Sequence, residues 1–232
     1  MSIQEELSLV MASLDVDGWG FADISGLPGG PPDGFEVAIS IVEANEWEGG
    51  IPLGEENEEE EFNRAHLESE DRLKVAVAAV TGFLDERGIR NLKVKGQFDE
   101  TLTSFFQHKT AARLAGLGWI GRNALLVTER FGPRVELATI LVDADLETGA
   151  PLDSASPCIE CSACVEACPF GSVIGGLWEP GMSRDELVDV RSCDSARKSY
   201  IPELGRKLAC GRCEVYCPVG RVGWRVGSGL ES

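Results

Sequence analysis

Eight cysteines carry the clearest chemistry in this 232-residue chain, and all of them lie after residue 157. The first four form a C-x2-C-x2-C-x3-C-P run, made of Cys158, Cys161, Cys164 and Cys168 with Pro169 behind them. Gaps of two residues allow one loop to present three thiolates to three corners of a 4Fe-4S cluster, while the fourth cysteine of such a run ligates a neighbouring cluster. The run therefore predicts iron-sulfur chemistry, in which electrons move one at a time.

The second group of cysteines contains the ligands that this crossover requires. Cys210, Cys213 and Cys217 form a C-x2-C-x3-C-P half-motif, and an isolated Cys193 precedes it. Four cysteines for each cluster give two clusters. The predicted ligands are Cys158, Cys161, Cys164 and Cys217 for the first cluster, and Cys193, Cys210, Cys213 and Cys168 for the second.

Two zinc sites are the alternative, because zinc held by four cysteines also uses C-x2-C pairs. Zinc does not account for the third closely spaced cysteine of the first group or for the two Cys-Pro endings. Disulfides are not expected. The N-terminus, MSIQEELSLVMASLDVDG, is acidic and has no long apolar core, so we predict a cytoplasmic protein, whose thiols stay reduced.

The elements around these cysteines indicate two domains. Residues 1–150 contain helix and strand patterns, whereas from Pro151 onward the cysteines concentrate and strand patterns are absent. The predicted fold class is α+β. An N-terminal α/β sandwich-like domain with an antiparallel hairpin covers 1–150, and a small bacterial-ferredoxin-like module with two clusters covers 151–232.

Apolar periodicity places the individual elements of the first domain. Helices are predicted over 3–14, from Ser69 to Gly88 and over 101–115. Strands are predicted at 19–24, 35–42, 92–94, 124–128 and 135–142, with the last two forming the antiparallel hairpin. Residues 43–71 hold twelve acidic residues and one basic residue, and this stretch is predicted to be a solvated loop.

Three glycines at residues 116, 118 and 121 have the G-x-G-x-x-G spacing of dinucleotide-binding loops. Such a loop follows a strand and opens a helix, so that the helix N-terminus faces the pyrophosphate. Here the expected order is helix, glycines, strand. We therefore reject a dinucleotide site and expect the glycines to allow a tight turn and close backbone packing.

The stretch HKTAARLAGLGWIGRNALLVTERFGPRVELATIL, residues 108–141, together with the two crossed cysteine groups at 158–218, resembles the epoxyqueuosine reductase family and, more distantly, the reductive dehalogenases. The resemblance implies a cobalamin-dependent or related iron-sulfur reductase. Its two 4Fe-4S clusters would feed electrons to a cobalamin held against residues 1–150. The cofactor-binding residues implied by the resemblance are Gly116, Gly118, Trp119, Gly121, Arg122 and Asn123.

One departure from the family concerns the proton donor. The family has an acidic residue ahead of the glycine turn, and Leu102 stands at that position here. Asp99, slightly upstream, and His108, slightly downstream, are the candidate catalytic residues, since both side chains can deliver a proton.

Together these features predict an iron-sulfur oxidoreductase with an unidentified small-molecule substrate and a redox partner protein as electron donor. The alternative is an electron-transfer or activator protein that reduces a cofactor on a partner and has no substrate of its own. The net charge of −18 repels phosphate backbones, so nucleic acid is not expected as a partner. No stretch reaches the about 20 apolar residues that span a bilayer, so no membrane association is expected.

Overall fold

The computed structural model describes residues 1–28, 31–45, 56–96, 102, 104–152, 158–200 and 210–221. The chain forms two compact units. Unit 1 comprises Met1–Asn45, Leu67–Gly118 and Val135–Leu152, and unit 2 comprises Glu46–His66, Trp119–Arg134 and Asp153–Ser232. The chain passes from unit 1 to unit 2 for the last time after Leu152, close to the boundary predicted near residue 150. Unit 2 also contains two earlier segments, Glu46–His66 and Trp119–Arg134, which the prediction had assigned to the first domain.

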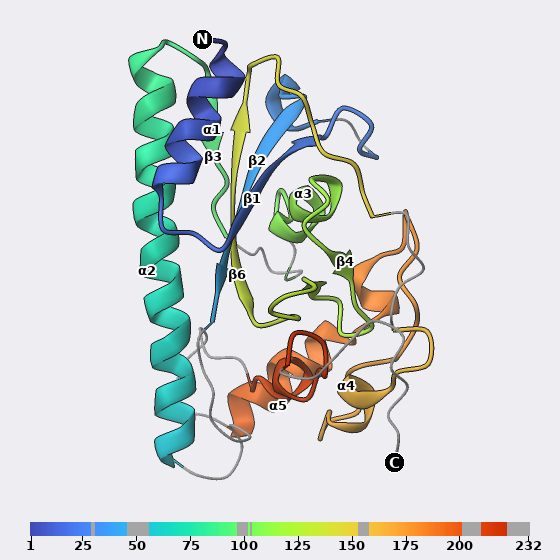
Figure 1. Cartoon of the computed structure of the whole chain (residues 1–232). Coiled ribbons are helices and arrows are strands. Elements are labelled where there is room, and N and C mark those ends of the chain that lie inside the picture. Colours follow the sequence, from blue (N-terminus) through green and yellow to red (C-terminus); the bar gives the residue numbers. More distant parts are fainter. Residues whose placement is uncertain are drawn as a thin grey trace. The chain divides into compact units, whose positions relative to one another are not determined.

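Unit 1 is built on a four-stranded antiparallel sheet with the order β1-β2-β6-β3 (Figure 1). The central strands β2 (Val37–Ala44) and β6 (Val135–Val142) pair over their full lengths. The edges are β1 (Gly18–Asp23) and the short β3 (Asn91–Lys93). These are four of the five predicted strands, and the α+β class is confirmed.

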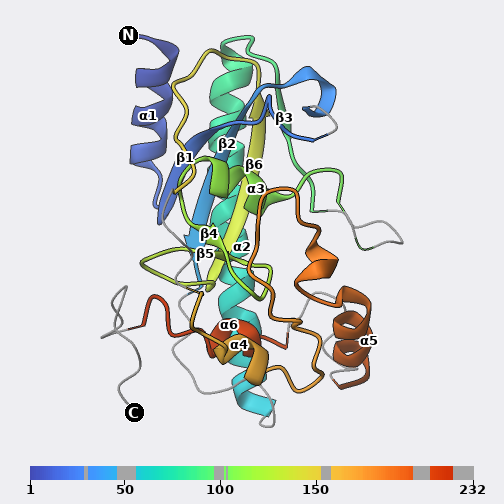
Figure 2. The same ribbon diagram turned by 90° about the vertical axis from the view of Figure 1, so that its right-hand side faces the viewer.

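Helices cover both faces of this sheet. On one face, α1 (Ile3–Ser13) and α2 (Glu56–Glu86) bury an apolar stripe against β2 and β6. On the other face lies α3 (His108–Leu114), and in Figure 2 it stands in front of the strands while α2 lies behind them. Side chains of β2 alternate between the two cores, as a strand buried on both faces requires: Ile39 and Ile41 on the α2 side, Ala38 on the α3 side.

The acidic stretch is where the sequence prediction fails. Residues 56–71 are helical, so the predicted loop is wrong for them, while residues 46–55 lie outside the described part of the chain. Ser69 was expected to precede the helix but stands inside it, fully buried. Its hydroxyl donates to the Ala44 carbonyl at 2.9 Å, which satisfies a polar group on the face that packs on the sheet.

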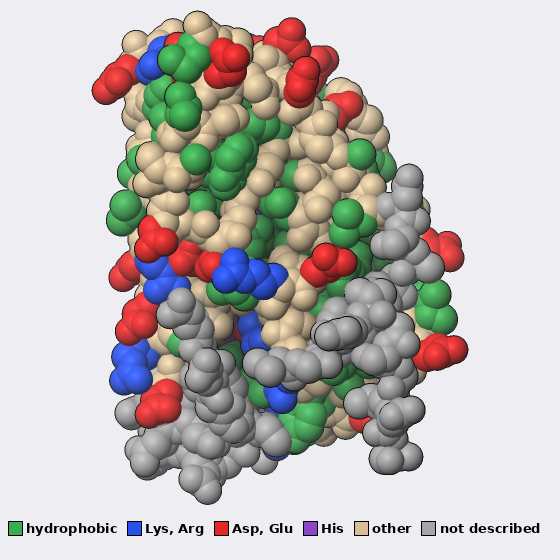
Figure 3. All heavy atoms as spheres, viewed as in Figure 1, with side chains coloured by type: hydrophobic (Ala, Val, Ile, Leu, Met, Phe, Trp, Pro, Cys, Tyr) green, Lys and Arg blue, Asp and Glu red, His purple; other side chains and the backbone are tan. Residues whose placement is uncertain are grey.

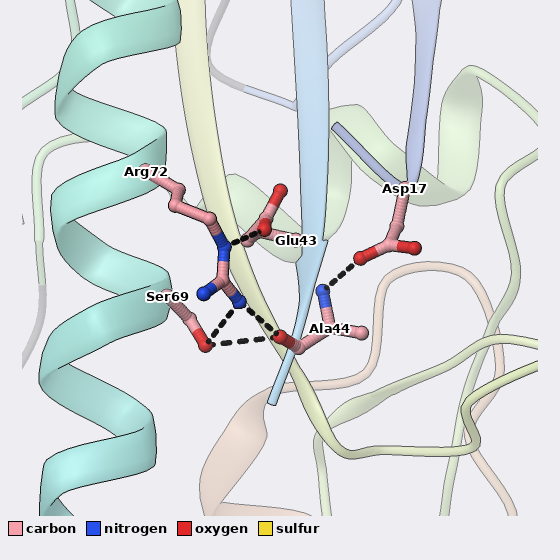
Figure 4. A network of polar contacts seen from close by, with 5 residues as sticks. All are labelled: Asp17, Glu43, Ala44, Ser69 and Arg72. Atoms are coloured by element: carbon pink, nitrogen blue, oxygen red, sulfur yellow. Dashed lines mark hydrogen bonds and ion pairs between the residues drawn. The ribbon is translucent and has the colours of Figure 1, made fainter. Parts of the chain in front are cut away.

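A buried ion pair fixes α2 to the end of β2. The Arg72 guanidinium donates to the Glu43 carboxylate and, at 3.1 Å, to the Ala44 carbonyl (Figure 4). The Ala44 N–H donates to Asp17 at 2.9 Å. Glu43 is only 3% exposed, and burial raises the pKa of its carboxyl while Arg72 opposes that shift. This pair therefore couples the strand to the helix where the apolar core ends.

Unit 2 has short elements. A two-stranded hairpin joins β4 (Trp119–Ile120) to β5 (Leu126–Val127), and four helical segments follow: α4 (Ala163–Glu166), η2 (Arg184–Glu186), α5 (Val190–Tyr200) and α6 (Arg212–Val215). An antiparallel hairpin is present, but the predicted pairing of 124–128 with 135–142 is wrong. β5 pairs with β4, and β6 pairs with β2 and β3.

The region before the glycines differs in extent from the prediction. Among the described residues of the helix predicted over 101–115, only those of α3 are helical, and Leu102 has a left-handed backbone (φ 60°) that a helix does not contain. Another short helical turn, η1 (Pro32–Gly34), lies in unit 1. Among the described residues, no helix is both long enough and apolar enough to cross a membrane.

Candidate iron-sulfur site

A cavity in unit 2 brings together four cysteines from both groups. Cys158, Cys161 and Cys164 reach it from the first group, and Cys217 reaches it from the second. The remaining lining residues are Gly121, Arg122, Asn123, Val127, Ala163, Pro218 and Val219. The four thiols are those that the spacing assigned to the first cluster. Their role as ligands remains a prediction, which their shared cavity supports.

Local structure explains how both groups form tight loops. The Cys161 N–H donates to the Cys158 carbonyl, and α4 begins two residues after Cys161, which places Cys164 on its first turn. In the second group, Gly211 caps α6 in the left-handed conformation (φ 69°), a backbone that favours glycine. The helix then ends just before the Cys217-Pro218 pair. Each loop thus turns sharply beside its cysteines.

Two of the thiols in this cavity, Cys164 and Cys217, have raised pKa values. Burial, with added repulsion from Cys158 and Cys161, raises the pKa of Cys164 to about 11. Burial also raises the pKa of Cys217 to about 12, although the Arg134 cation opposes the shift. Thiolates bind metals, so loading the site requires proton release. A buried, thiol-rich cavity of this kind suits a thiophilic iron centre.

The second predicted set is only partly drawn together. Burial raises the pKa of Cys213 well above its ordinary value, and the next causes are charge repulsion from Glu214, Cys210 and Cys193. Three of the four predicted members thus interact. Cys168 accepts an N–H bond from Ser172 at 3.3 Å, and its place in this set remains a prediction. In the described parts of the chain, no three His, Cys, Asp or Glu side chains form a group able to hold one metal ion.

Arg122 and Asn123, predicted to bind a cofactor, hold the two cysteine loops. Arg122 donates to the carbonyls of Cys158 at 2.8 Å and Ile159 at 2.9 Å, and also to the Gly175 carbonyl. Asn123 donates to the Cys213 carbonyl at 3.0 Å. Two adjacent residues therefore connect the first cysteine group to the second. Direct binding of a corrinoid by either residue remains a prediction.

Trp119 packs against the cysteines instead of lying on the surface. It is 8% exposed and forms one apolar cluster with Val127, Cys217 and Val219, with Cys158 packed against it. Its indole nitrogen is buried and has no hydrogen-bond partner among the described residues. Because a buried indole N–H usually finds an acceptor, this orphaned donor is a second observation that fits a bound inorganic group beside the thiols.

The glycines have the packing role expected of them. Gly116 has φ +77°, and a Cβ there would lie 2.6 Å from the Ala150 carbonyl oxygen. At Gly121 a Cβ would lie 2.7 Å from Asn123 Oδ1 and 2.8 Å from Val127. Gly118 lies between α3 and β4, so the order helix, glycines, strand is confirmed.

The candidate catalytic residues lie apart from the cysteines in the sequence. His108 opens α3, and its Nδ1 lies 3.0 Å from the Thr139 hydroxyl on β6. Burial lowers the pKa of His108, while Glu136 opposes the shift, so the imidazole is neutral at pH 7. Asp99 lies outside the described residues. A proton-delivery role for either residue remains a prediction.

Arg134 holds the backbone beside the cavity, a contact that the sequence did not predict. It donates to the carbonyls of Val219 at 2.7 Å and Cys217 at 3.2 Å, next to the site. The backbones meet here, since a Cβ on Gly132 would lie 2.2 Å from the Val219 carbonyl oxygen. Gly132 and Gly220 are the sequence features that allow this close backbone approach. Their positions in the sequence do not reveal that the two glycines lie next to each other in the fold.

Comparison with known proteins finds similar epoxyqueuosine reductases. The epoxyqueuosine reductase of Listeria monocytogenes is 31% identical over 151 residues, covering 64% of this chain and 38% of that protein. The chain is a relative of the epoxyqueuosine reductases. A second relative, the epoxyqueuosine reductase of Gloeobacter violaceus, is 35% identical over 123 residues. The chain spans less than two fifths of the length of these two curated relatives. No family model matches the chain.

Solved structures establish the fold of this relative. A catabolic reductive dehalogenase has a TM-score of 0.67 and 18% identity, covering 94% of this chain and 32% of that one. An epoxyqueuosine reductase with a tRNA-Tyr epoxyqueuosine-modified stem loop has a TM-score of 0.60 and 18% identity, covering 94% and 65%.

The second neighbour corrects the exclusion of nucleic acid. A protein of this fold is described with a tRNA stem loop, so a net charge of −18 does not exclude such a partner. Net charge sums the whole chain, whereas binding depends on the local surface. On the face drawn in Figure 3, basic side chains lie among acidic ones, so the charge is not a uniform layer.

Proposed function

We propose that the chain is an iron-sulfur oxidoreductase that holds two 4Fe-4S clusters and passes single electrons to a corrinoid or another small acceptor bound by residues 1–150. The observation that carries the proposal is the cavity in which Cys217 of the second group joins Cys158, Cys161 and Cys164 of the first. That crossover is the arrangement expected of a two-cluster module.

The chain's own residues would supply the cluster ligands, exclude water from them and restrict the movement of the cysteine loops. When bound, 4Fe-4S clusters supply one-electron transfer, and a corrinoid supplies a redox-active cobalt. The eight thiolates hold the clusters, and the apolar cluster around Trp119 keeps water from Cys158 and Cys217. Arg122 and Asn123 fix the two cysteine loops against one turn, which limits their movement when the charge of a cluster changes.

The similar proteins support a choice of electron acceptor and of first substrate to test. The likeness to epoxyqueuosine reductases and to a reductive dehalogenase supports a corrinoid as acceptor. An epoxyqueuosine-modified tRNA stem loop is the first substrate to test, because a neighbour of the same fold is described with one.

Metal analysis tests the cluster assignment. Protein purified anaerobically is expected to be brown and to contain about eight iron atoms per chain, four for each cubane. Cys161→Ser and Cys193→Ser form a reciprocal pair, each expected to disturb one cluster and leave most of the other. Stoichiometric zinc without iron would overturn the proposal, and a Cys193→Ser variant with both clusters intact would overturn the second ligand set.

Titration with cob(II)alamin tests the acceptor. Binding is expected to change the electron paramagnetic resonance spectrum of the cobalt, because a new environment alters its axial ligation. A spectrum that stays that of free cob(II)alamin, in protein whose clusters are reducible, would contradict the corrinoid and favour the electron-transfer alternative. Cys161→Ser protein is the matched control, since it retains residues 1–150.

A further inference from the structure

Arg134 lies beside the cavity, and backbone carbonyls surround its guanidinium. Its guanidinium donates to the carbonyls of Cys217 and Val219, with Glu214 at a longer 3.5 Å. The side chain is half-buried, and burial lowers its pKa while Cys217 opposes that shift. An arginine remains protonated through such a shift, because its ordinary pKa exceeds 12.

Arg134 belongs to the same 119–134 segment as Arg122 and Asn123. Each of the three side chains donates to a different cysteine carbonyl: Arg122 to Cys158, Asn123 to Cys213 and Arg134 to Cys217. Arg134 is the member of this set that bonds the backbone of Cys217, the ligand that the second group is predicted to supply to the first cluster. Of the other cations nearby, Arg122 lines the cavity and bonds the Cys158 carbonyl, whereas Arg221 is exposed, so water screens its field more strongly.

We propose that Arg134 is a positioning residue that raises the reduction potential of the cluster held by Cys158, Cys161, Cys164 and Cys217. The inference rests on the proposed function. When this cluster takes up one electron, it gains one negative charge. A fixed cation in a partly water-excluded place stabilises the reduced form more than the oxidised form, which makes reduction easier. The guanidinium contacts the backbone of the Cys217 loop and would act on the cluster through its field and through that loop.

The field of Arg134 also distinguishes the two predicted clusters. The Cys213 carbonyl, in the second set, accepts from the neutral Asn123 side chain, whereas the Cys217 carbonyl, in the first set, accepts from the Arg134 cation. Removing the charge of Arg134 is therefore expected to shift one potential and leave the other near its original value.

The test is a dithionite titration of the reconstituted full chain, followed by electron paramagnetic resonance, with the two cluster signals assigned from Cys161→Ser and Cys193→Ser. Arg134→Gln is expected to move the midpoint of the first cluster to a more negative potential and to leave the second unchanged. Arg134→Lys keeps the charge and is expected to retain most of the original midpoint. Arg130→Gln is the matched control, because Arg130 is exposed in the same segment and carries the same charge.

The outcomes separate this inference from the proposed function. Wild-type protein without iron would overturn the proposed function itself. Arg134→Gln protein with a full iron content and unchanged midpoints would overturn only the role of Arg134. If Arg134→Gln does not assemble both clusters, Arg134→Lys decides. An unshifted midpoint supports the charge effect, and a lowered midpoint despite the retained charge overturns it.

Discussion

The two units of the molecule are stabilised by different means. Unit 1 buries a continuous apolar core between its sheet and helices, with Leu7, Ile39, Val80, Leu84 and Ile140 all fully buried. Unit 2 has two strands of two residues each, and both helices that carry cysteines of the two motifs, α4 and α6, are four residues long. Helices of that length are not stable alone in water.

Hydrogen bonds to backbone carbonyls supplement a small apolar cluster in unit 2. Arg122, Asn123, Arg134 and Arg221 all donate to carbonyls of the cysteine loops or of α6. Such contacts contribute about 1 kcal/mol each, far less than a buried side chain in a well-packed core. From this difference we expect unit 1 to fold on its own core and unit 2 to depend on the clusters proposed for its cysteines.

Removal of metal breaks this comparison most strongly. Anaerobic chelation of iron is expected to abolish amide protection over 158–174 and 210–221, because metal binding supplies most of the folding free energy of a site of this type. Hydrogen exchange with mass spectrometry measures both units in one sample. The sheet strands β2 and β6 serve as the internal control and are expected to keep their protection. Equal loss in the two units would show that their stabilities are not separate.

Truncation of the unit 1 core is the next largest effect. Leu84→Ala removes a fully buried side chain and is expected to destabilise unit 1 by about 3 kcal/mol, from lost burial and the cavity left behind. Urea unfolding followed by circular dichroism measures the change. Val75→Ala is the control on the same helix, since Val75 is 69% exposed, and is expected to stay within about 0.5 kcal/mol of wild type.

The sequence predicted the core strands and the cysteine cavity because both depend on local patterns. Strand alternation and cysteine spacing are short-range signals, and they identified β1, β2, β3 and β6 and the four cysteines that share the cavity. The length of α2 was missed although its apolar positions extend back to Phe62, which is 1% exposed. Ser69 interrupted the apolar pattern because its buried hydroxyl bonds to Ala44, a contact that only the tertiary structure reveals.

The arginine contacts could not be predicted from local patterns. Arg122 bonds carbonyls 36 or more positions away, and Arg134 bonds the Val219 carbonyl 85 positions away. A carbonyl carries no residue identity, so no sequence motif marks it as a partner. The hairpin failed for a related reason. Strands of two residues such as β4 and β5 have no period to detect, and the longer β6 pairs with β2 instead.

The ion pair between Arg72 and Glu43 lies at the end of β2, where the apolar core of unit 1 ends, and a substitution there measures its contribution to stability. Arg72→Met leaves Glu43 buried without its cation, and we expect a loss of about 2 kcal/mol, below the value for a fully buried pair because a third of the Arg72 side chain is exposed. Lys74→Met is the matched control. Its pairs with Glu70 and Asp71 are exposed and contribute little, so the urea midpoint is expected to stay near wild type.

The smallest expected effect concerns His108, the one titratable group that α3 packs toward β6. Burial lowers the pKa of His108 from its ordinary value of 6.5. At a pH between the lowered pKa of the folded chain and 6.5, the unfolded chain therefore binds a proton that the folded chain does not. Stability is therefore expected to fall as the pH drops below about 6.5, and His108→Gln is expected to make that fall shallower by less than one proton. Urea unfolding at several pH values measures the slope. Thr139→Val removes the hydroxyl partner but leaves the imidazole buried, so it is expected to keep the wild-type slope. A slope that disappears in Thr139→Val and persists in His108→Gln would show that burial of the imidazole is not the cause.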